Sequence, residues 1–359
     1  MQSMAASRFF IATFIILMAI VSVVLGFHFF SSHQVIIGDG INGPKGMAWI
    51  PGREFLMGCN TRLAKHNEMP AHKIRVDGFW IDQTDITNAQ FAIFVKATGY
   101  VTTAEKKPDW KTLKVQLPPG TPKPPEQKLI PGAMVFVGTS HPVQLDDASQ
   151  WWRFVPGANW RHPYGPLSNI IGKENHPVVQ VSYEDALAYA KWIGKRLPTE
   201  AEWELAARGG LEQTNYSWGD EFRPKGKRMA NTFAGEQFPV VDPAFKQKIG
   251  TSAVASYPPN GYGLYDMAGN VWQWVADWYR ADAFAQTAGM AEPVNPKGPD
   301  NCFDPSHSSI PFDAPKRVIR GGSFLCDENF CMSYRPSARR GVDPYNPMSH
   351  IGFRLVQSS

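Results

Sequence analysis

The 359-residue chain is long enough for one large domain or two ordinary ones, and its 43% hydrophobic and 13% aromatic content can fill a sizeable core. Its net charge of +4 comes from 36 basic and 32 acidic residues that are interspersed. A nucleic-acid-binding protein gathers Lys and Arg in a stripe, so we expect no nucleic-acid partner. The 31 Gly and 30 Pro residues exceed average usage, which favours a turn-rich α+β fold with little regular secondary structure.

The chain starts with a segment that predicts a membrane anchor. Residues 9–30 carry no charge apart from the titratable His28, and about 20 apolar residues span the hydrocarbon core of a bilayer. Arg8 precedes this run and no acidic residue does, so the positive-inside rule leaves the N-terminus in the cytoplasm. We therefore expect a signal anchor with one transmembrane helix at residues 1–32 and a linker at residues 33–45.

This anchor predicts a single-pass protein of the cell membrane. Its folded domain would lie outside the cytoplasm, on the periplasmic side in a Gram-negative cell. The alternative is a cleaved signal peptide, which would leave a secreted soluble form. The apolar region of such a peptide is usually about 7–15 residues long, and this run is longer. Both interpretations export the domain.

The remaining residues, 46–359, show no break in composition and predict a single domain. Strand-like runs occur at 55–58 and 79–82. Three helices are then indicated by capping boxes, in which a Ser or Thr is followed three residues later by an acidic residue or Gln: Thr87 with Gln90, Ser182 with Asp185, and Thr199 with Glu202. We expect these helices to end near Gly99, Trp192 and Gly209. Residues 105–132, rich in Pro and Lys, predict a solvent loop, and short β-like runs follow at 318–320, 324–325 and 351–355.

Four cysteines are present: Cys59, Cys302, Cys326 and Cys331. Side chains five residues apart on a straight strand point to opposite faces. The sulfurs of Cys326 and Cys331 can therefore meet only if residues 327–329 form a turn, which their polar composition favours. Two thiolates so placed form a soft site that selects Cu(I), whereas zinc needs two further ligands, and none is visible nearby. By spacing alone a structural disulfide is the more frequent outcome, and both remain open. We expect Cys59 and Cys302 to be free thiols, with a mutual disulfide as the alternative.

The cysteine pair lies in a segment, residues 320–354, that resembles the C-terminal signature of the formylglycine-generating enzymes. The matching elements are Gly-Gly-Ser-Phe-x-Cys at 321–326, a second Cys five residues later, Tyr-Arg at 334–335, Ser-Ala-Arg at 337–339, and Ser-His-x-Gly-Phe-Arg at 349–354. Residues 156–163, 196–204 and 260–272 also look like that family. The resemblance covers about residues 46–356, and the cysteine pair is its most specific part.

This resemblance implies a C-type-lectin-like α+β fold and a reaction. The reaction is the O2-dependent oxidation of the cysteine in a Cys-x-Pro-x-Arg motif of an unfolded or nascent sulfatase to Cα-formylglycine. Carried onto this chain, Cys326 and Cys331 would hold Cu(I). Ser323 would hydrogen-bond near the sulfur or the bound oxygen, and Trp272 would help to wall the pocket. The family commonly has Tyr just before the second cysteine, where this chain has Phe330.

The resemblance also implies two calcium sites, since calcium binds carboxylate, amide and backbone oxygens. One would use Asp266, Gly269, Val271 and Gln273, although the family usually has Glu at the last of these positions. The other would use Asn231 and the backbone of Thr232, but its expected Asp-x-Phe partner has no match. The alternative for Asp266 and Asn231 is a role in stabilising turns.

The competing function is a non-catalytic lectin-like binding module or maturation scaffold of the same fold. Maturation factors with this fold generally lack the cysteine pair, so the pair favours the oxidase. A related non-haem iron oxidase would need a His-x3-His-x-Glu-like cluster, and none of the nine histidines lies in one.

Overall fold

The computed structural model describes residues 34–242, 249–291, 293–306 and 308–358. Its contacts separate Met1–Gln34 from Val35–Ser359, and the second unit is the subject below. The anchor expected at residues 9–30 lies outside the described residues, so it stays a prediction. Within the described ranges, no helix is both long enough and apolar enough to cross a bilayer. Residues 36–38 hydrogen-bond to the first strand through Gly38 and Trp49.

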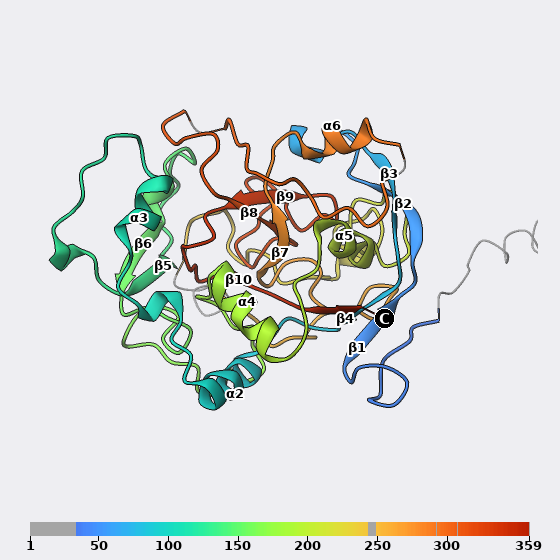
Figure 1. The fold of residues 1–359 in the computed structure, drawn as a ribbon, viewed down its shortest axis with the longest axis horizontal. Coiled ribbons are helices and arrows are strands. Elements are labelled where there is room, and N and C mark those ends of the chain that lie inside the picture. Colours follow the sequence, from blue (N-terminus) through green and yellow to red (C-terminus); the bar gives the residue numbers. More distant parts are fainter. Residues whose placement is uncertain (1–33, 243–248, 292, 307, 359) are drawn as a thin grey trace, which may run out of the picture. The chain divides into compact units, whose positions relative to one another are not determined.

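The strands are short and belong to four small sheets (Figure 1). A three-stranded antiparallel sheet contains, in order, β1 (Met47–Ile50), β4 (Phe79–Asp82) and β11 (Val356–Ser358). A four-stranded sheet contains β10 (Ile351–Gly352), β7 (Trp272–Trp278), β8 (Arg317–Arg320) and β9 (Arg339–Val342). Two strand pairs complete the set: β2 (Arg53–Met57) with β3 (His72–Val76), and β5 (Gly132–Phe136) with β6 (Trp152–Pro156).

All three predicted helices are present, as α2 (Asn88–Thr98), α4 (Tyr183–Trp192) and α5 (Glu200–Arg208). Each has the reciprocal capping box that its sequence predicts, and Gly99 and Gly209 end α2 and α5 in the left-handed conformation. Two shorter α-helices are α3 (Trp110–Leu113) and α6 (Ala283–Ala288). Single 3-10 turns are η1 (His66–Glu68), η2 (Thr103–Glu105), η3 (Lys114–Gln116), η4 (Glu126–Lys128), η5 (Ala148–Gln150) and η6 (Pro224–Gly226).

The strand predictions were less accurate than the helix predictions. The runs at 55–58, 79–82 and 318–320 correspond to β2, β4 and β8, but only the first two residues of the run at 351–355 form a strand. The run at 324–325 is a buried turn instead. Gly321 and Gly322 precede it with φ of 90° and 70°, a conformation that turns the chain out of a sheet. The expected loop at 105–132 is mostly irregular but contains α3.

Strand register gives the four-stranded sheet two different faces. Gln273, Arg320 and Arg339 are aligned across β7, β8 and β9, and so are Trp274, Ile319 and Arg340 one position further along. Because neighbouring side chains of a strand point to opposite faces, the first set lies on one face and the second set on the other. We call these the charged face and the aromatic face.

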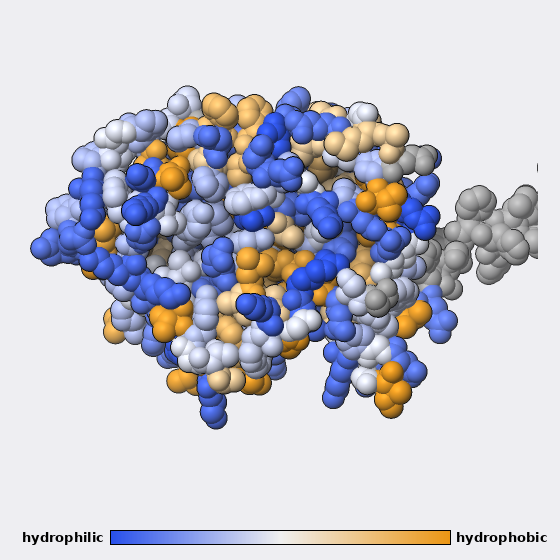
Figure 2. Space-filling view, in the orientation of Figure 1, coloured by the Kyte–Doolittle hydropathy of each residue, from blue (hydrophilic) through white to orange (hydrophobic). Residues whose placement is uncertain are grey.

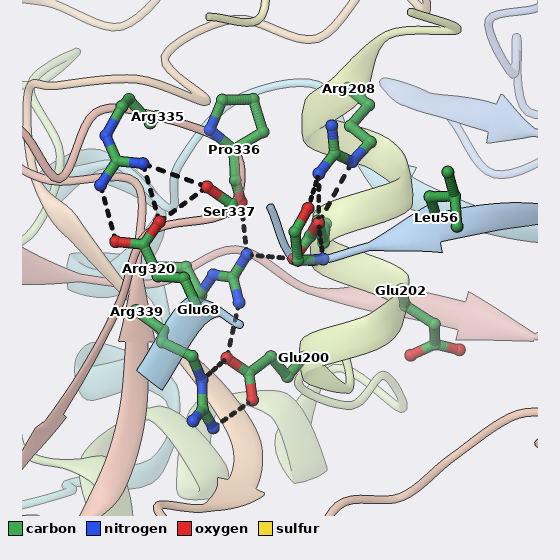
Figure 3. Close-up of polar contacts among 12 residues, drawn as sticks. Leu56, Glu68, Glu200, Glu202, Arg208, Arg320, Arg335, Pro336, Ser337 and Arg339 are labelled. Atoms are coloured by element: carbon green, nitrogen blue, oxygen red, sulfur yellow. Dashed lines mark hydrogen bonds and ion pairs between the residues drawn. The ribbon is translucent and has the colours of Figure 1, made fainter. Parts of the chain in front are cut away.

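The charged face packs against α5 through buried ion pairs (Figure 3). Arg320 bonds Glu200 at 2.5 Å and Glu204 at 2.7 Å, and Arg339 bonds both oxygens of Glu200 at 2.7 Å. Arg208, on α5 itself, bonds Glu204 at 2.6 Å. Burial alone would raise the pKa of Glu200, but the guanidinium groups of Arg339 and Arg320 outweigh it and hold this pKa below its usual value. The carboxylates therefore stay charged inside the protein.

On the face of the molecule that Figure 2 shows, apolar side chains form separate groups among hydrophilic ones. The apolar interior is correspondingly divided: one buried cluster contains Trp203, Val275 and Val318 on the α5 side of the sheet, and another contains Trp274 and Ile319 on the aromatic side. The sheet therefore separates two cores.

Replacing Arg320 with Leu should lower the free energy of unfolding by about 3–5 kcal/mol, because the substitution leaves two buried carboxylates without one of their guanidinium partners. The measurement is urea unfolding followed by tryptophan fluorescence. Lys107→Met is the control, since its ion pair with Glu126 is more than half exposed and should contribute less than about 1 kcal/mol. Equal losses in the two variants would contradict the structural role of Arg320.

Candidate active site

The predicted turn between Cys326 and Cys331 is present. The carbonyl of Asp327 accepts hydrogen bonds from the backbone N–H groups of Phe330, Cys331 and Met332 at 3.0–3.3 Å, and its carboxylate accepts one from the N–H of Asn329 at 2.8 Å. The chain thus reverses within five residues. The two Cα atoms lie 4.8 Å apart, and the sulfurs are joined as a disulfide.

The two glycines before the first cysteine leave room for this turn. A Cβ atom on Gly322 would lie 3.1 Å from the Cys326 sulfur and 2.9 Å from backbone atoms of the 333–334 segment, which is closer than such contacts allow. The carbonyl of Gly321 accepts a hydrogen bond from the N–H of Gly269 at 2.8 Å. The glycine pair therefore lets the cysteine turn pack directly against neighbouring backbone.

Ser323 and Trp272 both lie buried beside the turn. The Ser323 hydroxyl oxygen accepts a hydrogen bond from the N–H of Leu325 at 3.2 Å, and its carbonyl accepts one from the N–H of Cys326 at 2.9 Å. Its printed contacts are thus within the turn rather than to a sulfur. Trp272 opens β7 and belongs to the same buried cluster as both cysteines. It thus lies where the wall of a site around the sulfurs would be.

An aromatic stack supports the second cysteine. The ring of Phe330 lies parallel to that of Phe238, with centroids 4.4 Å apart and planes 9° apart, and Trp151 meets Phe330 edge-on at 6.0 Å. Sequence reasoning treated Trp151 as core and did not single out Phe238. No local pattern connects these residues with Phe330, because the contact is made only by the tertiary fold.

Two polar residues adjoin the aromatic wall. The carbonyl of His350 accepts a hydrogen bond from the N–H of Trp272 at 2.9 Å, and its ring lies 4.8 Å from that of Trp152. Burial and then the charge of Arg340 lower the pKa of His350 to about 3, so its ring is neutral at physiological pH. The Arg340 guanidinium lies over the rings of Trp272 and Phe330, at 5.7 and 6.0 Å.

The cysteine pair lies just beneath the protein surface. Cys326 is 1% exposed and Cys331 is 5% exposed, while Glu328 and Asn329 in the turn above them are exposed. The other two cysteines, Cys59 and Cys302, are buried thiols outside any disulfide, as expected. Any partner of the pair therefore has to approach past the turn at 327–330.

The donor atoms of the turn suit copper. Two sulfurs held side by side form the soft ligand set that Cu(I) prefers, although the disulfide must first be reduced, because the thiolate is the metal-binding form. In the described part of the chain, no group of three or more His, Cys, Asp or Glu side chains could hold a metal ion. Copper bound here would thus have two protein sulfurs and would need a third ligand from outside.

The first predicted calcium site does not fit its ligand set. The Gln273 oxygen accepts hydrogen bonds from the indole of Trp203 at 2.7 Å and from Arg354 at 2.8 Å, and its amide group donates to the carbonyl of Asp266 at 2.8 Å. One oxygen of the Asp266 carboxylate accepts from the N–H of Ala255, and the other has no partner. Gln273 is thus fully used by the protein.

The other residues of the predicted calcium sites are also engaged. Gly269 donates to Gly321 and pairs with Asn231, and Val271 is a fully buried core residue. In the second site, the amide of Asn231 donates to the carbonyl of Gly250. The carbonyl of Thr232 accepts from the Arg228 guanidinium at 2.8 Å, a cation where calcium would bind. We derive no role for calcium.

Chelation with EDTA should leave the melting temperature unchanged, because Gln273 links Asp266, Trp203 and Arg354 without a metal. A calcium ion that binds only the folded protein would add about 2.7 kcal/mol at a hundred times its Kd, so calorimetry with and without EDTA separates the two cases. Gln273→Ala should lower the free energy of unfolding by about 3 kcal/mol, since several buried groups lose their partners. A large drop in melting temperature with EDTA would restore the calcium interpretation.

His350 should make the protein less stable in acid. Its folded pKa of about 3 lies below the ordinary value of about 6.5, so the unfolded chain takes up the proton first and stability is lost as the pH falls from about 6.5 towards 3. Between pH 7 and 5, His350→Gln should lose about 2 kcal/mol less unfolding free energy than the unmodified protein. Urea unfolding at the two pH values measures this, and identical losses would contradict it.

Comparison with known proteins agrees with this geometry. Residues 37–359 match the model of the family described as the sulfatase-modifying factor enzyme 1-like domain. The formylglycine-generating enzyme of Thermomonospora curvata is 44% identical over 87% of this chain and 93% of its own length, and that of Mycobacterium tuberculosis is 44% identical over 86% and 96%.

A solved structure, that of PvdO from Pseudomonas aeruginosa, has a TM-score of 0.56 over 92% of this chain and 97% of that one, with 23% identity. This likeness concerns the fold alone, and it agrees with the low content of regular secondary structure. The family match and the two bacterial relatives carry the assignment further: the chain belongs to the formylglycine-generating enzymes, a family of oxidoreductases.

Proposed function

We propose that this protein oxidises the cysteine of a Cys-x-Pro-x-Arg motif in unfolded sulfatases to Cα-formylglycine with O2, and that copper bound by Cys326 and Cys331 takes part. The observation that carries the proposal is the pair of sulfurs on one turn in a chain of this family. Bound Cu(I) would supply a centre that binds the substrate thiolate and activates O2. Conversion of CH2–SH to CHO is an oxidation, and O2 would be the electron acceptor.

The protein's own residues would hold and shield the reacting thiol. Cys326 and Cys331 supply the two metal-binding sulfurs, and the hydroxyl of Ser323 lies in the same turn. Trp272 and Phe330 form an apolar wall beside them, which would keep water from the reaction. Because this chain has Phe330, no phenol hydroxyl next to Cys331 takes part. Export by the predicted anchor would place the reaction outside the cytoplasm and next to the membrane.

A non-catalytic scaffold is the second candidate, and a specific observation favours it. Both sulfurs are almost fully buried and joined to each other, as in a disulfide that only staples a turn. The oxidase needs this bond to be reduced and needs the 327–330 turn to give access to a substrate thiol. The two candidates therefore differ in whether the reduced pair binds copper.

The test is to incubate the exported region, about residues 40–359, with Cu(I), O2 and a peptide that contains Cys-x-Pro-x-Arg. We expect mass spectrometry to show the loss that corresponds to replacing CH2–SH with CHO. The Cys326→Ser and Cys331→Ser variants should lose at least about 10²-fold in kcat/KM, since each removes a ligand whose loss typically costs a metal enzyme that much.

Cys302→Ser is the matched control, because this buried thiol bonds only to Lys316 backbone groups and should leave turnover unchanged. Copper binding by the reduced protein, measured separately, should be lost with either serine variant of the pair and kept in the control. An unmodified peptide under aerobic, copper-replete conditions would rule out the oxidase and favour the scaffold.

A further inference from the structure

Arg340 is the exception among the arginines around the four-stranded sheet. Its neighbour Arg339 points to the charged face and bonds both oxygens of Glu200. Arg340 points to the aromatic face, in register with Ile319, and its guanidinium lies over Trp272 and Phe330. It thus places one positive charge on the wall that adjoins the cysteine turn.

No carboxylate in the described part of the chain forms an ion pair with this guanidinium, and its Nε atom is buried without a hydrogen-bond partner. The other arginines of this region are paired: Arg320 with two glutamates, and Arg335 with Glu68 through both nitrogens at 2.6 and 2.7 Å. A buried donor without a partner costs free energy. An incoming acceptor would remove that cost.

The surroundings of Arg340 supply no negative charge either. Burial and the charge of Arg340 lower the pKa of Lys65, so this exposed ammonium group lies close to the guanidinium and has the same sign. His350 is neutral. Glu68, the carboxylate nearest in sequence to Lys65, is already bonded by Arg335 and Ser337. The group that would satisfy Arg340 must therefore come from outside the chain.

We propose that Arg340, with Lys65 beside it, binds a side-chain carboxylate of the polypeptide substrate near the cysteine to be oxidised. This inference rests on the proposed function and adds to it an acidic residue outside the Cys-x-Pro-x-Arg motif. A guanidinium is suited to this role because its planar donors match the two oxygens of a carboxylate. Asp and Glu are the anions that an unmodified polypeptide provides.

The plain alternative is that Arg340 only holds Trp272 and Phe330 in place through its contacts with their rings. That role would affect every peptide alike. A binding role would affect only peptides that carry the acidic residue. Comparing Glu with Gln at one peptide position separates the two, because these side chains have the same shape and differ in charge.

The experiment uses peptides with Ser in place of the reactive Cys, so that binding is measured without turnover. Glu is placed at each position flanking the motif in turn, with Gln at the same position as reference, and Kd is measured by fluorescence anisotropy. We expect at least one position at which Glu binds about fivefold more tightly than Gln, the range of a partly exposed ion pair. Arg340→Met should remove this preference, and Lys65→Met should reduce it.

Arg223→Met is the control: it also removes one positive charge and a contact with an aromatic ring, that of Phe222, and it should keep the preference. The proposal is overturned if no position prefers Glu, or if the preference survives in Arg340→Met. Formylglycine formation on the matching Cys peptides is scored separately. An Arg340-dependent preference without any formylglycine would leave this inference standing and defeat the proposed function, and formylglycine without the preference would do the reverse.

Discussion

The fold depends on the ion pairs that join α5 to the four-stranded sheet. Buried carboxylates are tolerated only when they are paired and hydrogen-bonded, and here Glu200 and Glu204 on α5 meet Arg320 on β8 and Arg339 on β9. The strands are too short to define their own positions by a long ladder of hydrogen bonds. The charge pairs fix which helix residue faces which strand residue, and the apolar clusters on both sides of the sheet form around them.

The candidate site inherits its geometry from the same strands. Arg320 is followed at once by Gly321 and Gly322, whose positive φ angles lead the chain from β8 into the cysteine turn. Trp272 begins β7 on the other side of β10. The anchored sheet thus presents the turn and its aromatic wall to each other, although the residues that form them are distant in sequence. The chemistry that we propose needs such a fixed arrangement, because two sulfurs must face one ion.

The sequence predicted the features that local physics determines. Capping boxes such as Thr199 with Glu202 marked all three main helices, and the polar residues after Cys326 indicated the turn. It did not reveal features that long-range packing determines, such as the stack of Phe238 on Phe330 or the bonds that occupy Gln273. The run at 324–325 looked like a strand because its side chains are apolar, but the preceding glycines turn it away from the sheet.

The placement of Arg339 and Arg340 on opposite faces has a consequence for how mistakes in folding would act. Side chains alternate along a strand, so a slip of β9 by one residue would exchange the two arginines. Arg339 would then lie against tryptophan, and Glu200 would face a differently placed guanidinium. A chain misaligned in this way would lose its interior pairing and its substrate-facing charge together. Quality control that detects instability would thereby also remove molecules with a faulty recognition surface.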